Sequence, residues 1–295
     1  MRARPNIKST FKAYLYLFPA LSIIVLFSFY PIIRSFDMAF HTDYHFIRQE
    51  VYARGIDNFV FLLNDPRFAR AILNTAVFAF FVVPIQILIS LAIAVMLNSN
   101  IKGKAVFRAI YFLPFVTSVV AVSMVWQFIF HTGNGVLNHF LLFFGFEAVS
   151  WLMDPDYALL SLIIMSIWRG LGFNIVILLA GLQNVDKGLY LAARVDGAKR
   201  INRFRTVTLP GLSPALFFLF IMGTISSFRV FTEVFALFGG DPGPGNSALT
   251  IVFYIVQSFQ NRSFGVSSAA AVVLFSIIFA ITLIQMSIGR KLVHY

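Results

Sequence analysis

Two apolar stretches of this chain contain polar side chains whose types and spacing could bind a ligand. Trp168, Arg169 and Asn174 lie in one stretch, and Arg229 and Glu233 lie in another. Ionisable groups inside long apolar stretches are costly and usually functional, and a carboxamide can both donate and accept hydrogen bonds. These five residues are therefore our candidates for a polar ligand path.

Each candidate also has a structural explanation. Arg229 and Glu233 are four residues apart, so on one continuous helix they would pair and neutralise their charges. Arg169 has no oppositely charged residue in its own stretch, and it could contact a second subunit, a ligand oxygen or the membrane surface. Asn174 could instead bond a neighbouring helix. The sequence leaves both explanations open.

The sequence contains no recognisable catalytic motif. It has no G-x-x-x-x-G-K-[ST] loop for nucleotide phosphates, no H-E-x-x-H motif, five scattered histidines and no cysteine. Zinc sites need such residues at ligand spacing. We therefore predict no catalytic residue, no metal and no cofactor, and a conformational role instead of an enzymatic one.

The composition predicts an integral membrane protein. Of 295 residues, 59% are hydrophobic and 12% are charged, and several apolar runs reach the ~20 residues that a helix needs to cross the hydrocarbon layer. The runs are continuous instead of alternating, which favours helices over strands. We predict an all-α polytopic protein with six transmembrane helices, at 13–36, 72–97, 107–130, 159–181, 211–237 and 265–288.

The basic residues indicate the orientation. The net charge is +11, and fifteen Lys and Arg residues lie on one side of the predicted topology against five on the other. Because basic loops stay in the cytoplasm, we expect cytoplasmic tails at 1–12 and 289–295, a six-span transmembrane domain at 13–288 and a cytoplasmic loop at 182–210. This distribution argues against nucleic acid as a partner. The twelve-residue apolar run 249–260 is too short to span and is expected to be re-entrant or interfacial.

The cytoplasmic loop is predicted to form a helix, a turn and a second helix. Val185 to Val195 favours a helix, Asp196–Gly197 signals a turn, and Lys199 to Val207 places apolar residues on one face of a second helix. A basic amphipathic segment suits either anionic lipid or a docking protein, and the pattern alone does not decide between them.

Several residues of this loop follow a known pattern in order and spacing: Ala192, Ala193, Asp196, Gly197, Ala198, Phe204, Leu209 and Pro210. They resemble the "EAA" loop in permease subunits of binding-protein-dependent ABC importers, which docks in a cleft of the ATPase subunit. The glutamate that opens the family motif is Leu191 here, so a partner permease would carry the ionic contact or apolar packing would replace it. The resemblance implies an ATPase-coupling loop at 185–209 that includes Tyr190, Leu191, Ala192, Ala193, Asp196, Gly197, Ala198, Phe204 and Pro210.

The resemblance extends over nearly the whole chain. GIDNFVFLLNDPRFARAILNT (55–75) is similar to the external segment before the second span in the carbohydrate and glycerol-phosphate branch, and 238–275 is similar to the last external loop and span, with GGDPGPG where GGGP is usual. The resemblance implies the type I importer permease fold in a bacterial cell (inner) membrane. The implied partners are a second permease subunit (heterodimer), two ATPase subunits, an extracytoplasmic solute-binding protein, the lipid bilayer and a sugar or oligosaccharide substrate.

Two alternatives stay open. A polyol phosphate of the glycerol-3-phosphate type is the other substrate class, because Arg169 and Arg229 could bind a phosphate. An ion-driven secondary transporter is the other functional class, and inverted repeats with broken helices would favour it; we find no such internal symmetry.

Overall fold

The computed structural model describes residues 7–45, 50–99 and 103–292. The chain divides into two compact units. One is formed by Met1–Asn64 and Ile255–Val273, and the other by Asp65–Tyr254 and Leu274–Tyr295. The outer parts of the predicted tails, 1–6 and 293–295, lie outside the described residues.

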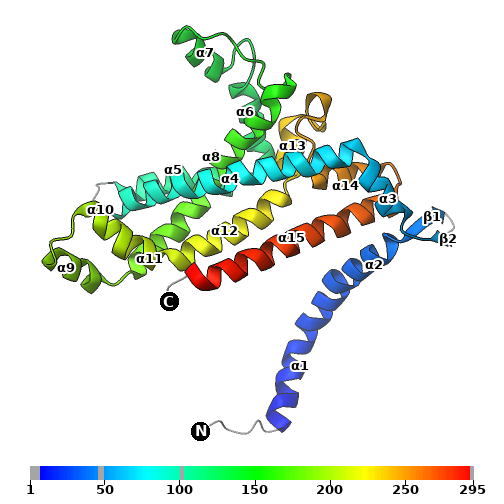
Figure 1. Ribbon diagram of the computed structural model, residues 1–295, viewed down its shortest axis with the longest axis horizontal. Helices are drawn as coiled ribbons and strands as arrows, with labels where there is room; N and C mark the ends of the chain where they lie inside the picture. Colours follow the sequence, from blue (N-terminus) through cyan, green and yellow to red (C-terminus); the bar gives the residue numbers. More distant parts are fainter. Residues whose placement is uncertain (1–6, 46–49, 100–102, 293–295) are drawn as a thin grey trace. The chain divides into compact units, whose positions relative to one another are not determined.

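The larger unit contains two long helices, α4 (Pro66–Asn98) and α8 (Pro155–Asn184), which pack along each other (Figure 1). Each begins at an Asp–Pro pair. Asp65 and Asp154 each accept a hydrogen bond at 2.9 Å from the backbone N–H two residues later. An N-cap aspartate satisfies a free N–H, and a proline at the first helical position has none to satisfy. These caps start both helices before the predicted spans.

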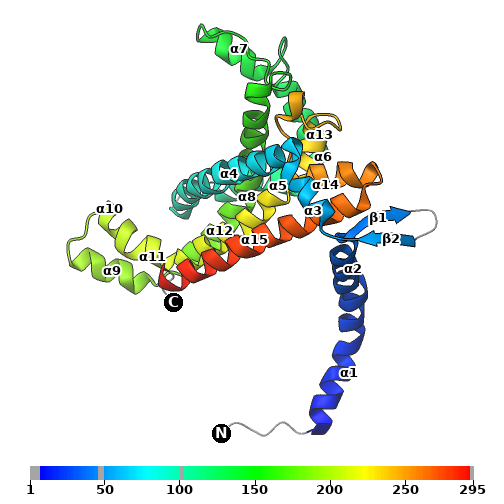
Figure 2. The ribbon, with the colours of Figure 1, turned by 45° about the vertical axis from the view of Figure 1, so that its right-hand side comes forward.

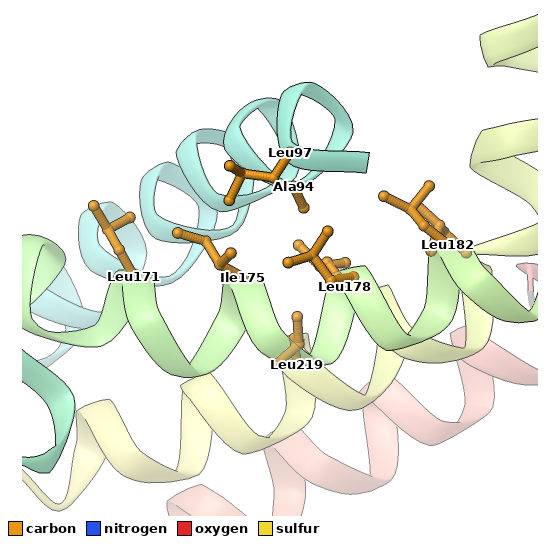
Figure 3. Close-up of a cluster of buried hydrophobic side chains, with 9 residues drawn as sticks. Ala94, Leu97, Leu171, Ile175, Leu178, Leu182 and Leu219 are labelled. Carbon is orange, nitrogen blue, oxygen red and sulfur yellow. The ribbon is translucent and has the colours of Figure 1, made fainter. Parts of the chain in front are cut away.

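An apolar cluster joins α4 and α8 to α12 (Ser213–Phe228), as Figure 3 shows. On α8, Leu171, Ile175, Leu178 and Leu182 recur at spacings of three or four residues and so share one face. Within a bilayer such contacts hold helices together by close van der Waals packing. The other members of the cluster are Ala94, Leu97, Leu179, Leu212 and Leu219.

The third predicted span, 107–130, is not one straight helix. It consists of α5 (Lys104–Val116) and α6 (Val119–Ile129), and the two meet at a bend of 108°. The two residues between them have extended backbone angles, with ψ of 145° and 132°. Pro114 in the last turn of α5 cannot donate a helical hydrogen bond, which weakens the helix just before the bend.

The fifth predicted span, 211–237, is interrupted twice. A bend of 63° separates Arg200–Gly211 from α12, where the sequence LPGLSP supplies two prolines. Further on, α12 ends at Phe228 and the short helix α13 (Thr232–Leu237) follows. The prediction of a continuous helix is therefore wrong here as well.

The predicted number of six spans is reached when the bent helix pairs are counted as spans. Within the described residues, four helices are long and apolar enough to cross a membrane, and the count is six if each bent pair is one span. The four are Tyr14–Met38, α4, α8 and Phe264–Arg290 within α15 (Phe264–Leu292). The apolar run after residue 248 forms the ten-residue helix α14 (Ile251–Gln260), which is too short to span.

Two buried asparagines hold the long loops of the larger unit. Asn138, in α7 (Val136–Phe143), donates to the Val149 carbonyl at 2.9 Å and accepts from Trp151 Nε1 at 2.8 Å. Asn74 of α4 donates to the Leu249 carbonyl at 3.0 Å. The four glycines of GGDPGPG all have positive φ, from 59° to 99°, which side chains other than glycine rarely allow. This loop also contains a 3-10 turn, Pro244–Asn246.

The smaller unit contains a short β-ribbon that the all-α prediction did not include. Asp37 anchors this ribbon to the preceding helix, with carboxylate oxygens 3.3 Å from His41 Nε2 and 3.4 Å from Arg54 Nη2. The elements of this unit are α1 (Ile7–Ile24), a π-helical turn (Val25–Phe29), α2 (Tyr30–Met38), the antiparallel strands β1 (His41–His45) and β2 (Glu50–Arg54), α3 (Asp57–Asn64) and parts of α14 and α15.

Candidate functional site

A cavity of about 300 Å³ lies within the larger unit, among α4, α5, α8, α12 and α13. We call it the polar cavity. A largely apolar wall with a few convergent polar groups is typical of a small-molecule site. Arg169, Asn174 and Glu233, three of the five residues selected from the sequence, line it. The polar residues of its wall are Gln86, Ser166, Arg169, Asn174, Ser226, Ser227 and Glu233.

The charged groups of this cavity neutralise each other. Arg169 Nη1 donates to Glu233 Oε1 at 3.2 Å, and the two side chains are only 22% and 20% exposed. Within the described residues, the ion pair of Glu233 is with Arg169 and not with Arg229. The alternative in which Arg229 pairs with Glu233 on one helix is not realised, because the helix is broken between them: Arg229 is the C-cap of α12, and Glu233 lies in α13.

Side chains from other segments hold the break that positions Glu233. Thr250 Oγ1 donates at 2.9 Å to the carbonyl of Val230, which lies between α12 and α13. Gln127 Nε2 donates to the carbonyls of Ala236 and Leu237 at 2.9 and 3.0 Å, at the other end of α13. Carbonyls released by a helix break must find partners away from water. The break is therefore a supported feature of the fold.

Gln86 is a cavity residue that we did not select from the sequence. Its Nε2 donates to the carbonyls of Ser166 and Ile167 at 3.2 and 3.3 Å, and its Oε1 accepts from Asn174 Nδ2 at 3.3 Å. A Cβ at Gly170 would overlap the amide nitrogen of Gln86, so this glycine makes room for the contact. A glutamine in the middle of the apolar run FFVVPIQILIS was the available signal.

Two polar atoms of the cavity wall have no hydrogen-bond partner among the described residues. Arg169 Nε and Ser166 Oγ are both buried and unpaired, and both residues line the polar cavity. Buried polar atoms are nearly always satisfied in folded proteins. These two atoms, which can donate, are therefore available to a ligand oxygen.

The remaining two candidates lie apart from the cavity. Trp168 is 42% exposed and packs edge-to-face against Trp126, with ring centroids 5.6 Å apart. Arg229 is exposed at the end of α12. Neither lines the polar cavity. Arg169, the residue after Trp168 on α8, does line it, because successive helix residues point in different directions.

The predicted coupling loop is a helix, a turn and a second helical arm (Figure 2). Asp186 caps α9 (Lys187–Val195) by accepting from Gly188 N at 2.7 Å. The turn has Gly197 at φ 73°, and the Ala198 N–H returns to the Ala193 carbonyl at 2.9 Å. This is the usual glycine-ended helix terminus. The second arm consists of α10 (Arg200–Arg203), the π-helical turn Phe204–Thr208 and α11 (Leu209–Gly211).

The two arms of this loop contact each other but leave apolar residues exposed. Tyr190 Oη and Thr208 Oγ1 share a hydrogen bond at 2.9 Å across the arms. Leu189, Leu191 and Val195 of α9 are 54%, 59% and 88% exposed. Of the residues selected from the motif, Leu191, Ala192, Asp196 and Gly197 are exposed, and Tyr190, Ala193, Ala198, Phe204 and Pro210 are half-buried.

Comparisons with known proteins cover almost the whole chain. Residues 86–294 match the model of the family described as "Binding-protein-dependent transport system inner membrane component". The chain belongs to this family. The permease is 30% identical over 277 residues to the trehalose/maltose transport system permease protein MalF of Thermococcus litoralis, which covers 94% of this chain and 93% of the relative.

Further relatives are named for different substrates. The lactose transport system permease protein LacF of Rhizobium radiobacter is 35% identical over 283 residues, 94% of each chain. The sn-glycerol-3-phosphate transport system permease protein UgpA of Brucella abortus is 29% identical over 286 residues, 96% of each chain. These relatives are permease subunits, which confirms that this chain is a membrane transport subunit and not an enzyme.

A solved structure confirms the fold class. The permease is similar to a chain of the bacterial alginate ABC transporter in complex with alginate pentasaccharide-bound periplasmic protein, with a TM-score of 0.84, 25% identity and coverage of 97% of this chain and 96% of that chain. The predicted all-α importer permease fold is therefore correct, apart from the bends and the β-ribbon described above.

Proposed function

We propose that this permease forms half of the translocation path of an ATP-driven importer for an uncharged sugar or oligosaccharide. The observation that carries the proposal is the internal Arg169–Glu233 pair, which leaves the described wall of the polar cavity without net charge. The other polar groups there are carboxamides and hydroxyls, which suit the hydroxyls of a carbohydrate. MalF and LacF, which are named for trehalose/maltose and lactose transport, support the same class.

The aromatic part of the wall suits the same ligand. Phe115 and Phe173 both line the polar cavity and stack on each other, with ring centroids 5.2 Å apart. An aromatic face can pack against the apolar face of a sugar ring while amides and hydroxyls bind its edge. We assign the unpaired Arg169 Nε and Ser166 Oγ to ligand oxygens.

A phosphorylated substrate fits this cavity less well. A phosphate needs cations that are free to bind it, but Arg169 is already paired with Glu233 and Arg229 lies outside the cavity. Because the chain is similar to UgpA, glycerol 3-phosphate is the substrate with which neutral sugars should be compared. The ion-driven alternative has no support in this family, whose members belong to binding-protein-dependent systems.

We assign the 185–209 loop to coupling with the ATPase. The exposed apolar residues Leu189, Leu191 and Val195 give α9 a surface that a partner protein would bury, and Leu191 would replace the ionic contact of the family motif with apolar packing. The loop and both termini would then be cytoplasmic, as the basic residues indicate. A second permease, two ATPase subunits and an external binding protein complete the proposed importer in a bacterial inner membrane.

The substrate class is tested with the complete importer in liposomes. ATP hydrolysis and uptake are measured with lactose, maltose and glycerol 3-phosphate, each presented by the binding protein. We expect stimulation by a neutral sugar, and loss of uptake in Asn174→Ala with normal assembly and basal ATPase activity. Stimulation by glycerol 3-phosphate alone would replace the sugar assignment with the polyol phosphate.

The coupling assignment is tested by crosslinking. A photocrosslinking residue replaces Val195, which is 88% exposed, and the chain is purified from native membranes. We expect a crosslink to an ATPase subunit. The same probe at Val136, which is 60% exposed in α7, is the control and should not reach that subunit. An ATPase crosslink from Val136 and none from Val195 would reverse the proposed orientation.

A further inference from the structure

A second cavity, of about 320 Å³, lies under the coupling loop. We call it the arginine cavity. Its wall combines both arms of the loop with the last turn of α4 and the end of α8. Arg194 from α9 and Arg200 and Arg203 from α10 all line it. Its size is within the range of small-ligand sites.

The positive charge of this cavity has no counter-charge in the described structure. No Asp or Glu is among the residues that line it. None of the ion pairs formed by the described residues includes Arg194, Arg200 or Arg203. Asp186, the acidic residue before α9, is occupied as its N-cap at 2.7 Å from Gly188 N.

Like charges in one small space repel each other, and the repulsion grows where water is partly excluded. An anion would relieve it. Two of the arginines, Arg200 and Arg203, are three residues apart on one short helix, so their side chains extend from the same face. Guanidinium groups bind phosphate oxygens with paired, charge-assisted hydrogen bonds. Phosphate is therefore the chemistry that this arrangement fits best.

We propose that the arginine cavity binds a phosphate group, either the headgroup of an anionic phospholipid or a free phosphate ion. The cavity lies where two membrane-length helices end: Asn98 is the last residue of α4, and Leu182 is in the last turn of α8. Helix ends of this kind meet the headgroup layer, and basic pockets at the cytoplasmic face attract anionic headgroups. The lipid source rests on the proposed cytoplasmic placement of the loop.

A bound phosphate would add a connection between the two arms of the loop. Arg194 is on the first arm and Arg203 is on the second, and the Tyr190–Thr208 hydrogen bond is already in place between the arms. A phosphate held by both arginines would bridge the arms and fix the loop against the ends of α4 and α8. The site would then set how firmly the loop transmits movement to the spans.

The test uses the purified importer complex and measures binding, not transport. Native mass spectrometry follows adducts of dioctanoyl phosphatidylglycerol, with dioctanoyl phosphatidylcholine as the neutral lipid, and inorganic phosphate is then added as a competitor. The variant is Arg200→Gln/Arg203→Gln. The matched control is Arg205→Gln, an exposed arginine of the next turn that does not line the cavity.

We expect phosphatidylglycerol to bind roughly thirtyfold more weakly to the double variant, since two basic residues near an anionic headgroup are lost, and equally well to Arg205→Gln. Strong competition by inorganic phosphate, with the same dependence on Arg200 and Arg203, would identify free phosphate as the ligand. Equal binding to all three proteins overturns the proposal. Loss of the ATPase subunit from the double variant with unchanged lipid binding also overturns it, because the arginines then serve as a docking surface. Neither result depends on which substrate is transported.

Discussion

The two cavities of the larger unit differ in how their arginines are compensated. In the polar cavity, Arg169 is 22% exposed and has a carboxylate oxygen 3.2 Å away. In the arginine cavity, Arg194 and Arg200 are exposed and no carboxylate is among the described lining residues. A charge that is mostly buried must be paired, because removing it from water is costly. A charge that keeps some contact with water can lack a partner within the protein, so it stays available to bind an anion.

This contrast suggests a division of roles. The pair in the polar cavity holds α8 and α13 in one geometry and keeps the described wall neutral, as an uncharged substrate requires. The unpaired arginines are left open to an anion or a partner. The predictions below test this division, beginning with the largest effect.

Glu233→Gln should have the largest effect, because it leaves Arg169 mostly buried without a counter-charge. We expect a loss of about 3 kcal/mol in the free energy of unfolding and a fall in sugar uptake of about tenfold or more. Thermal unfolding in detergent and uptake into liposomes measure the two quantities.

A double variant separates stability from function at this pair. Arg169→Met/Glu233→Leu removes both charges, so stability should return to near that of the unmodified protein, but uptake should stay low because the donors of Arg169 are lost. Normal uptake in the double variant would show that the pair is only structural.

Gly170→Ala should have an intermediate effect. The added methyl group would displace the Gln86 amide from its hydrogen bonds to α8 and to Asn174. We expect a loss of about 1–2 kcal/mol in the free energy of unfolding and severalfold slower uptake. The control is Gly223→Ala. Its Cβ would lie 3.2 Å from Val83 Cγ1, so this substitution should be tolerated better than Gly170→Ala.

The Gly170 effect should depend on Gln86. In a Gln86→Ala background the added methyl group does not overlap an amide. Gly170→Ala should therefore lower the free energy of unfolding much less in that background. If Gly170→Ala lowers the free energy of unfolding equally in both backgrounds, the absence of a side chain at Gly170 is not needed to make room for Gln86.

Leu191→Ala should act on coupling with little effect on folding, because this side chain is 59% exposed. We expect the uptake per ATP hydrolysed to fall about fivefold, since an apolar contact to the ATPase is lost. Lys187→Gln, at the start of the same helix, is the control. If Leu191→Glu improves coupling instead, the ATPase surface has kept the ionic contact of the family motif.

Arg229→Gln should have the smallest effect. This arginine is exposed and lies outside the polar cavity, so the free energy of unfolding should change by less than about 0.5 kcal/mol and uptake should be unchanged. Arg169→Gln, measured beside it, should be far more damaging. Similar losses in both variants would contradict the distinction between the paired and the exposed arginine.

The 185–209 loop shows how much local signals can predict. Its first helix, the Asp196–Gly197 turn and the second helical arm all follow from capping, glycine and spacing, and each of them is present. These signals act between residues close in the chain, so a sequence contains them in full. The same is true of the long apolar runs within α4 and α8, each of which is long enough to cross a membrane.

The polar cavity shows what such local signals cannot predict. Arg169, Asn174 and Glu233, which were selected from the sequence, line its wall, but Glu233 pairs with Arg169 instead of Arg229, and Gln86 was not selected. Glu233 is 64 residues from Arg169, and Gln86 is 88 residues from Asn174. No short-range pattern relates residues at such separations.

The sequence by itself therefore determined that this protein spans a membrane, which side chains are costly to place there and how the 185–209 loop folds, because hydrophobicity and capping act locally. Only the tertiary structure decided that the fifth span breaks after Phe228 and that Arg169 meets Glu233. Both depend on contacts from other segments, such as the Thr250 hydroxyl that satisfies the Val230 carbonyl at the break. A buried charge pairs with whichever opposite charge the folded helices bring within reach.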